Sequence, residues 1–269
     1  MTGCRFAGLT PRTDDNPPMT AAPSPLPPVN MSEHGKVRYL HLGTAWVQGS
    51  MWLKKPNDIE LEYVQRMQAW LLFHEADDVA DLHAMQLGLG AATLTKHCYR
   101  VLNMRTTAIE LNPQVVAACR TWFELPPDDE RLNVVLGDAA EVAAHTHWQA
   151  QIDVLHVDLY DDQAAAPVLD DPVFYGHCKN LLTSNGCMVV NLFGRSSRFE
   201  RSLAHISDAF GADALWAFSP TREGNTVVLA QREASRPAQD SLQARAAQIQ
   251  ARWRLPAPQW LRQFKPVAA

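Results

Sequence analysis

The chain has 269 residues, of which 46% are hydrophobic and 20% are charged, which is enough apolar material for one sizeable core. This composition excludes a wholly disordered protein. Lys and Arg total 24 against 29 Asp and Glu, a formal net charge of −5, and no basic run could neutralise a series of phosphates. We therefore expect no nucleic acid as partner. A mildly acidic chain can still contain a strongly acidic cleft that suits a small cation.

The first 33 residues differ from the rest of the chain. Seven of the 18 prolines fall in the first 28 residues, and this stretch has no apolar periodicity. It cannot bury enough surface to offset the entropy of ordering, so 1–33 is predicted to be a disordered leader. No secretory signal and no run of about 18 uncharged apolar residues is present. The sequence predicts a soluble protein without a membrane partner.

The cysteines and histidines give no sign of a metal site. The five cysteines are widely spaced, with no C-x-x-C pair and no Cys/His cluster at zinc spacing. We therefore expect no bound metal and a reducing, cytoplasmic setting.

A small N-terminal unit, 34–78, is predicted to contain a β-hairpin or meander and one helix. From Val37 the order V-R-Y-L-H-L alternates as in a strand, and W-V-Q-G-S-M-W-L follows. Asp58 precedes a stretch in which apolar residues recur at spacings of three and four from Ile59 to Trp70. This pattern predicts a helix that begins after Asp58.

The central part, 79–232, alternates short apolar runs with helical patterns. Strands are predicted over 85–88, 107–111, 133–136, 153–158 and 187–193, and helices near Ala92, Pro113, Ala139, Asp171 and Ser197. This alternation favours a parallel sheet covered on both faces. Two final runs, 214–218 and 225–231, are joined by a link too short for a helical crossover, so they form an antiparallel hairpin. The fold class is α/β, a doubly wound, methyltransferase-type Rossmann-like sheet.

The last segment, 233–269, is predicted to contain an amphipathic helix. Apolar residues recur on one face from Leu242 to Trp253, and Asp240 is a candidate N-cap. We expect this helix to pack on the core or on a neighbouring subunit.

Residues at the ends of the first three predicted strands of the sheet suit a nucleoside. Gly88 and Gly90 in L-G-L-G-A-A-T would let a ligand approach the backbone, although such glycines also serve packing alone. Glu110 ends the next strand, where its two oxygens can accept both ribose hydroxyls. Asp138 follows the third strand; it suits the adenine amino group, with the Ala139 backbone beside the ring, and it also suits an N-cap.

The fourth strand ends in a crowded group of carboxylates. In I-D-V-L-H-V-D-L-Y-D-D-Q, Asp158 ends an apolar run and is followed by Asp161 and Asp162. Three neighbouring carboxylates repel one another unless a cation compensates them. This arrangement predicts a small cationic substrate.

Residues from about 37 to 232 resemble the spermidine synthase (polyamine aminopropyltransferase) family. The resemblance rests on the β-rich N-terminal piece, the glycine motif, the acidic second strand, the G-D motif, the D-x-x-D segment and T-R-E-G-N-T-V-V-L-A. It implies a homodimeric enzyme that transfers an aminopropyl group from decarboxylated S-adenosylmethionine to an amine such as putrescine.

The resemblance also implies roles for individual residues. Asp158 would be the catalytic residue that takes the proton of the attacking amine. The donor would contact Gln48, Gly88, Gly90, Glu110, Asp138 and Ala139. The amine would contact Asp161, Asp162, Tyr160, Gln65 and Tyr63.

The chain departs from the family pattern in the glycine motif. Where the family has G-G-G-D-G-G, this chain has G-L-G-A-A-T, so Ala91 replaces an Asp that helps to hold the aminopropyl amine. The loss of that Asp would remove repulsion toward the carboxylate of intact S-adenosylmethionine. Two alternatives therefore stay open: an S-adenosylmethionine-dependent methyltransferase, and a non-catalytic paralogue that binds a nucleoside or polyamine.

Overall fold

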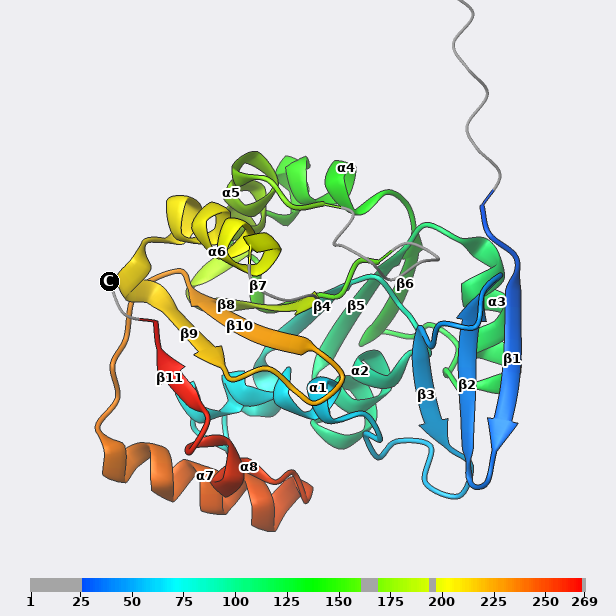
Figure 1. Cartoon of the computed structure of the whole chain (residues 1–269), viewed down its shortest axis with the longest axis horizontal. Helices are drawn as coiled ribbons and strands as arrows, with labels where there is room; N and C mark the ends of the chain where they lie inside the picture. The colour runs from blue at the N-terminus through cyan, green and yellow to red at the C-terminus, as the bar shows by residue number, and fades with distance from the viewer. Residues whose placement is uncertain (1–25, 161–168, 194–196, 268–269) are drawn as a thin grey trace, which may run out of the picture.

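The computed structural model describes residues 26–160, 169–193 and 197–267, and it contains a small sheet beside a large one (Figure 1). The small sheet is an antiparallel meander of β1 (Val29–His34), β2 (Val37–Leu42) and β3 (Gly49–Trp52). Five of the six residues of β1 fall within the predicted leader 1–33, so the prediction of disorder is wrong for these residues. The reason is that five of the six residues of β1 are exposed, so the strand carries no apolar pattern.

The large sheet contains eight strands within the described residues, in the order β11-β9-β10-β8-β7-β4-β5-β6. The strands are β4 (His83–Leu87), β5 (Arg105–Glu110), β6 (Leu132–Leu136), β7 (Ile152–Val157), β8 (Leu182–Phe193), β9 (Leu215–Phe218), β10 (Asn225–Gln231) and β11 (Phe264–Pro266). Strands β4 to β8 pair in parallel, whereas β8, β10, β9 and β11 pair antiparallel. The predicted doubly wound fold with a final hairpin is confirmed.

Helices cover both faces of the large sheet (Figure 1). One face carries α4 (Ala139–Ala144), α5 (Pro172–Leu181) and α6 (Ser197–Phe210); the other carries α1 (Glu62–Arg66), the 3-10 turn Ala69–Phe73, α2 (Thr93–Lys96), α7 (Gln239–Trp253) and α8 (Ala257–Trp260). Successive residues of one strand enter opposite cores: Ala84 joins the α7 side and Met85 the α5 side. The remaining helix, α3 (Pro113–Trp122), packs with the small sheet.

Two helix starts differ from the prediction. Helix α1 begins at Glu62, because the backbone N–H of Asp58 donates to Lys55 in a turn and the helix starts only after Leu61. The apolar spacing also fits the 3-10 turn that follows α1. Helix α7 begins at Gln239 without a side-chain cap, so Asp240 lies in the first turn, where an acid favours the helix dipole.

The carboxyl ends of β4, β5, β6 and β7 meet at one edge of the sheet. Strand β4 is first in sequence among them and lies between β5 and β7, so the strand order reverses beside it. Open α/β sheets bind ligands at such a reversal. None of the helices in the described ranges is long and apolar enough to cross a membrane.

Candidate active site

A cavity of about 790 Å³ opens at this edge of the sheet. Its wall combines the strand ends with the segment before β3, with α1 and with the β9–β10 turn. Among the described residues that line it, none is Lys, Arg or His, and six are carboxylic acids. These are Glu60, Glu62, Glu110, Asp138, Asp158 and Glu223. A cavity with this charge distribution attracts a cation.

The loop after β4 lies directly on neighbouring backbone. Gly88 has a φ of +86°, and a Cβ at this position would be 2.4 Å from the carbonyl oxygen of Asp158. Gly90 has a φ of +51°, and its Cβ would be 2.9 Å from the carbonyl oxygen of Gln48. Both positions therefore require glycine. Gly88, Gly90 and Gln48 all line the cavity.

Glu110 is held in place by two backbone N–H groups. Its Oε2 accepts from Leu89 at 2.9 Å and its Oε1 from Asn112 at 2.8 Å. Each oxygen keeps a further acceptor site, so the carboxylate is oriented and can still bind two hydroxyls. Burial raises the pKa of Glu110, and the N–H donors oppose that rise.

Asp138 performs the capping role that the sequence predicted. Its Oδ1 accepts from the backbone N–H of Ala140 at 2.7 Å, at the start of α4. Its other oxygen has no hydrogen-bond partner among the described residues, and both Asp138 and Ala139 line the cavity. The cap therefore leaves Asp138 free to contact a ligand.

Asp158 follows β7 and lies between two hydrogen-bond donors. Tyr63 Oη donates to Oδ2 at 3.2 Å, and Asn191 Nδ2 donates to Oδ1 at 2.9 Å. Burial raises the pKa of Asp158 to about 6, and both donors oppose that rise. The pKa of Tyr63 is raised well above its usual value by burial and by Asp158, so the phenol stays protonated as a donor. A carboxyl group with a pKa near 6 is ionised at neutral pH and can take a proton.

Asn191 is a site residue that the sequence analysis missed. It lies on β8, it is 4% exposed, and its Oδ1 has no partner among the described residues. Because a buried carbonyl oxygen without a donor is costly, this atom suits a ligand N–H beside Asp158. The available signal was a polar residue inside the apolar run M-V-V-N-L.

The amine-side predictions have different outcomes. Tyr63 and Tyr160 line the cavity, and Tyr160 Oη donates to the carbonyl oxygen of Asn191 at 2.8 Å. Gln65 is not among the described lining residues, and its Nε2 donates to the backbone of Ile59 at 2.9 Å. Asp161 and Asp162 lie outside the described residues.

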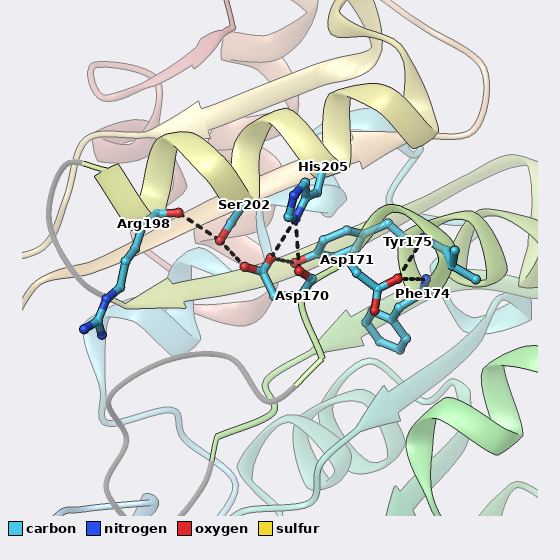
Figure 2. Close-up of polar contacts among 8 residues, drawn as sticks. Asp170, Asp171, Phe174, Tyr175, Arg198, Ser202 and His205 are labelled. Atoms are coloured by element: carbon cyan, nitrogen blue, oxygen red, sulfur yellow. Dashed lines mark hydrogen bonds and ion pairs between the residues drawn. The ribbon is translucent and has the colours of Figure 1, made fainter.

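Two further acids near the cavity have structural partners (Figure 2). Asp170 accepts hydrogen bonds from Tyr175 Oη at 2.9 Å and from Ser202 Oγ at 2.7 Å, so it joins α5 to α6. Asp171 accepts from two backbone N–H groups and caps α5. The adjacent Leu169 lines the cavity, so these contacts fix part of its wall. In the described part of the chain, no three His, Cys, Asp or Glu side chains form a group that could hold a metal ion.

The fold is a methyltransferase-type Rossmann-like sheet, and its cavity lies at the strand ends with six acids among the described lining residues. Sequence comparison shows polyamine aminopropyltransferases of Neisseria meningitidis serogroups A and B, each 34% identical over 211 residues and covering 78% of both chains. The same enzyme of Chromobacterium violaceum is 28% identical over 242 residues, 89% of this chain and 90% of the relative. The chain belongs to the polyamine aminopropyltransferase family, whose members are transferases. No protein-family model matches it.

Solved structures share this fold. A probable spermidine synthase from Corynebacterium glutamicum has a TM-score of 0.70 at 20% identity and covers 89% of this chain and 87% of its own. Human methyltransferase-like protein 13 in complex with SAH has a TM-score of 0.65 at 21% identity, over 72% of this chain and 93% of its own. A spermidine synthase in complex with the transition state analogue AdoDATO has a TM-score of 0.56 at 14% identity, over 77% and 73%.

Proposed function

We propose that the protein transfers the aminopropyl group of decarboxylated S-adenosylmethionine to a small amine. The main support is the position of Asp158, which lies between Tyr63 and Asn191. The described wall of the surrounding cavity has six carboxylic acids and no basic side chain. The family relatives are named for this activity. The comparisons do not favour the methyltransferase alternative.

In this mechanism the two halves of the cavity have separate tasks. Glu110 binds the ribose hydroxyls and Asp138 the adenine amino group, which places the sulfonium near Asp158. The amine nitrogen attacks the carbon beside sulfur, the carbon–sulfur bond breaks, and its electron pair leaves with sulfur as a neutral thioether. Asp158 accepts the proton that the nitrogen loses, and the free Oδ1 of Asn191 accepts a second N–H of the amine.

The charge of the cavity supports the decarboxylated donor. Ala91 is buried against the first residue of β3, where a Cβ at Gly49 would lie 2.6 Å from the backbone nitrogen of Ala91. Ala91 contributes no acid, but Glu60 is held beside this contact. Glu60 Oε2 accepts a hydrogen bond at 2.8 Å from Ser50 Oγ, and Ser50 follows Gly49. Because the described lining residues include six acids and no basic side chain, they would repel the carboxylate of intact S-adenosylmethionine.

Donor binding and product analysis test this proposal. In calorimetry we expect the decarboxylated donor to bind more tightly than intact S-adenosylmethionine, and mass spectrometry should show an aminopropyl group on putrescine. Tighter binding of the intact donor together with methylated product would identify a methyltransferase. Binding without any product would identify the non-catalytic paralogue.

Glu110→Ala should weaken binding of the decarboxylated donor by about 100-fold or more. Hydrogen bonds to a charged group contribute about 1.5–3 kcal/mol each, and the variant removes the acceptor of two ribose hydroxyls. Calorimetry measures the change. Glu141→Gln, an exposed acid on α4 outside the cavity wall, is the matched control and should leave the affinity unchanged. A Glu110→Ala affinity within about threefold of wild type would remove Glu110 from the ribose site.

We also propose a homodimer in a reducing, cytoplasmic setting. The family resemblance supports the dimer. The four described cysteines are buried and unpaired, which is typical of a reducing compartment. Analytical ultracentrifugation measures the oligomeric state, and a monomer at micromolar concentration would contradict the dimer.

A further inference from the structure

Arg66, the last residue of α1, joins this helix to the C-terminal part of the chain. Its side chain is 5% exposed. Nη1 donates to the carbonyl oxygen of Ser219 at 2.6 Å, while Nη2 donates to Glu62 Oε1 at 2.5 Å and to Gln263 Oε1 at 2.7 Å. The guanidinium also lies over the ring of Phe218, 5.1 Å from its centroid. One side chain thus links three polar groups from three parts of the sequence.

The groups that Arg66 reaches belong to one packed unit. Ser219 follows β9 and Gln263 precedes β11, and these strands pair antiparallel at the edge of the sheet. Phe264 of β11 stacks on Phe218 with ring centroids 4.6 Å apart, and on Trp216 at 5.4 Å. Figure 1 shows α7, α8 and β11 on the same side of the molecule as α1. Strand β11 is therefore fixed by its packing on β9, and it can serve as an anchor for α1.

Helix α1 carries Tyr63, the donor to Asp158, and depends on tertiary contacts for its position. It has five residues and no side-chain N-cap. Helices this short are unstable without packing. Tyr63 precedes Arg66 by less than one helical turn. If the Arg66 side chain loses its contacts, we therefore expect the phenol of Tyr63 to move as well.

We propose that Arg66, anchored on Ser219 after β9 and on Gln263 before β11, is a positioning residue that holds Tyr63 against Asp158. The inference rests on the proposed function for the role of Asp158, and it makes the C-terminal strand a determinant of proton transfer in the site. The groups facing Asp158 are Tyr63, Asn191 and the phenol of Tyr160. Arg66 itself faces Glu62 and neutral acceptors.

A pH readout separates this role from a contribution to stability alone. The hydrogen bond from Tyr63 lowers the pKa of Asp158, so a displaced phenol lets that pKa rise further above about 6. The acid limb of the kcat profile then moves to higher pH. A purely structural residue would lower the unfolding temperature without moving this limb.

The experiment compares Gln263→Ala and Arg66→Lys with Tyr63→Phe. Gln263→Ala changes no charge, and Arg66→Lys keeps the charge but loses the planar guanidinium that reaches three acceptors. We expect acid-limb shifts of roughly 0.3 to 0.5 pH unit for Gln263→Ala and about 1 unit for Arg66→Lys, both toward the Tyr63→Phe value. In the Tyr63→Phe background, Gln263→Ala should cause no further shift, because its effect passes through the phenol.

Arg245→Met is the matched control. Arg245 on α7 bridges to the carbonyl oxygen of Leu72 at 3.2 Å and to Glu75, so it joins the C-terminal part to the 3-10 turn and leaves α1 untouched. It should lower the unfolding temperature and leave the acid limb in place. If Gln263→Ala and Arg66→Lys behave in the same way as this control, the positioning role is wrong.

A titration without turnover keeps this test separate from the proposed function. Difference infrared spectroscopy of wild type against Asp158→Asn follows the carboxyl band of Asp158, and the same difference can be measured in the Gln263→Ala background. If Gln263→Ala raises the pH midpoint of the Asp158 titration, the positioning role is supported even in a protein that shows no aminopropyl transfer. An unchanged midpoint contradicts it even where wild type is fully active.

Discussion

Asp158→Asn should reduce kcat for aminopropyl transfer by about 10³-fold while changing donor affinity by less than a few-fold. A positioned general base contributes about 10²- to 10⁴-fold to a rate, and the amide cannot accept the proton. In the proposed mechanism the donor is bound by Glu110 and Asp138 at other strand ends, so donor binding should persist. Steady-state kinetics with putrescine and calorimetry with the decarboxylated donor measure the two quantities. Unchanged turnover would show that another group takes the proton.

The pH dependence of Asp158→Asn provides an internal check on its folding. Burial raises the pKa of Asp158 from 3.8 to about 6, so the folded state binds more protons than the unfolded state between these values. The contribution of Asp158 to stability is therefore present at low pH and is lost as the pH rises through about 6. At pH 8 the variant, which has no buried charge, should unfold at a higher temperature than wild type. Loss of activity together with a lower unfolding temperature would indicate misfolding instead.

The residues that could be predicted from the sequence share one property. Gly88, Glu110, Asp138 and Asp158 each end a strand or follow one within two residues, and parallel strands bring their carboxyl ends to one edge. Local patterns that locate the strands therefore also locate these side chains. The presence of these four residues on one cavity wall follows from sequence reasoning for this reason.

The residues that could not be predicted depend on contacts between distant segments. Asn191 becomes a site residue because β8 lies beside β7, which brings its amide to Asp158. Glu223 reaches the cavity wall from the β9–β10 turn, and its motif T-R-E-G gave no indication of that position. Strand β11 has only three residues and ends in Pro266, so it exists only as the partner of β9. Arg66 gains its acceptor Gln263 from the residue just before this same strand.

Gly88→Ala should destabilise the protein by roughly 2–5 kcal/mol and reduce kcat by more than about 10²-fold. The added Cβ would lie 2.4 Å from the carbonyl oxygen of Asp158, and the backbone at φ +86° is unfavourable for any side chain. The contact meets backbone rather than a flexible side chain, so the strand ends of β4 and β7 must separate. Such a displacement moves Asp158 away from Tyr63 and Asn191. Urea unfolding and steady-state kinetics measure the two effects.

Gly176→Ala is the matched control for this substitution, because the same chemical change should not lower the free energy of unfolding there. Gly176 lies inside α5, and a Cβ there would have no neighbour within 4 Å. Alanine in a helix interior is favoured over glycine by about 0.5–1 kcal/mol, so Gly176→Ala should be neutral to stabilising and fully active. If Gly88→Ala matched Gly176→Ala in both stability and kcat, the β4 loop would have room to move, and its close approach to Asp158 would not be what places the proposed catalytic carboxylate.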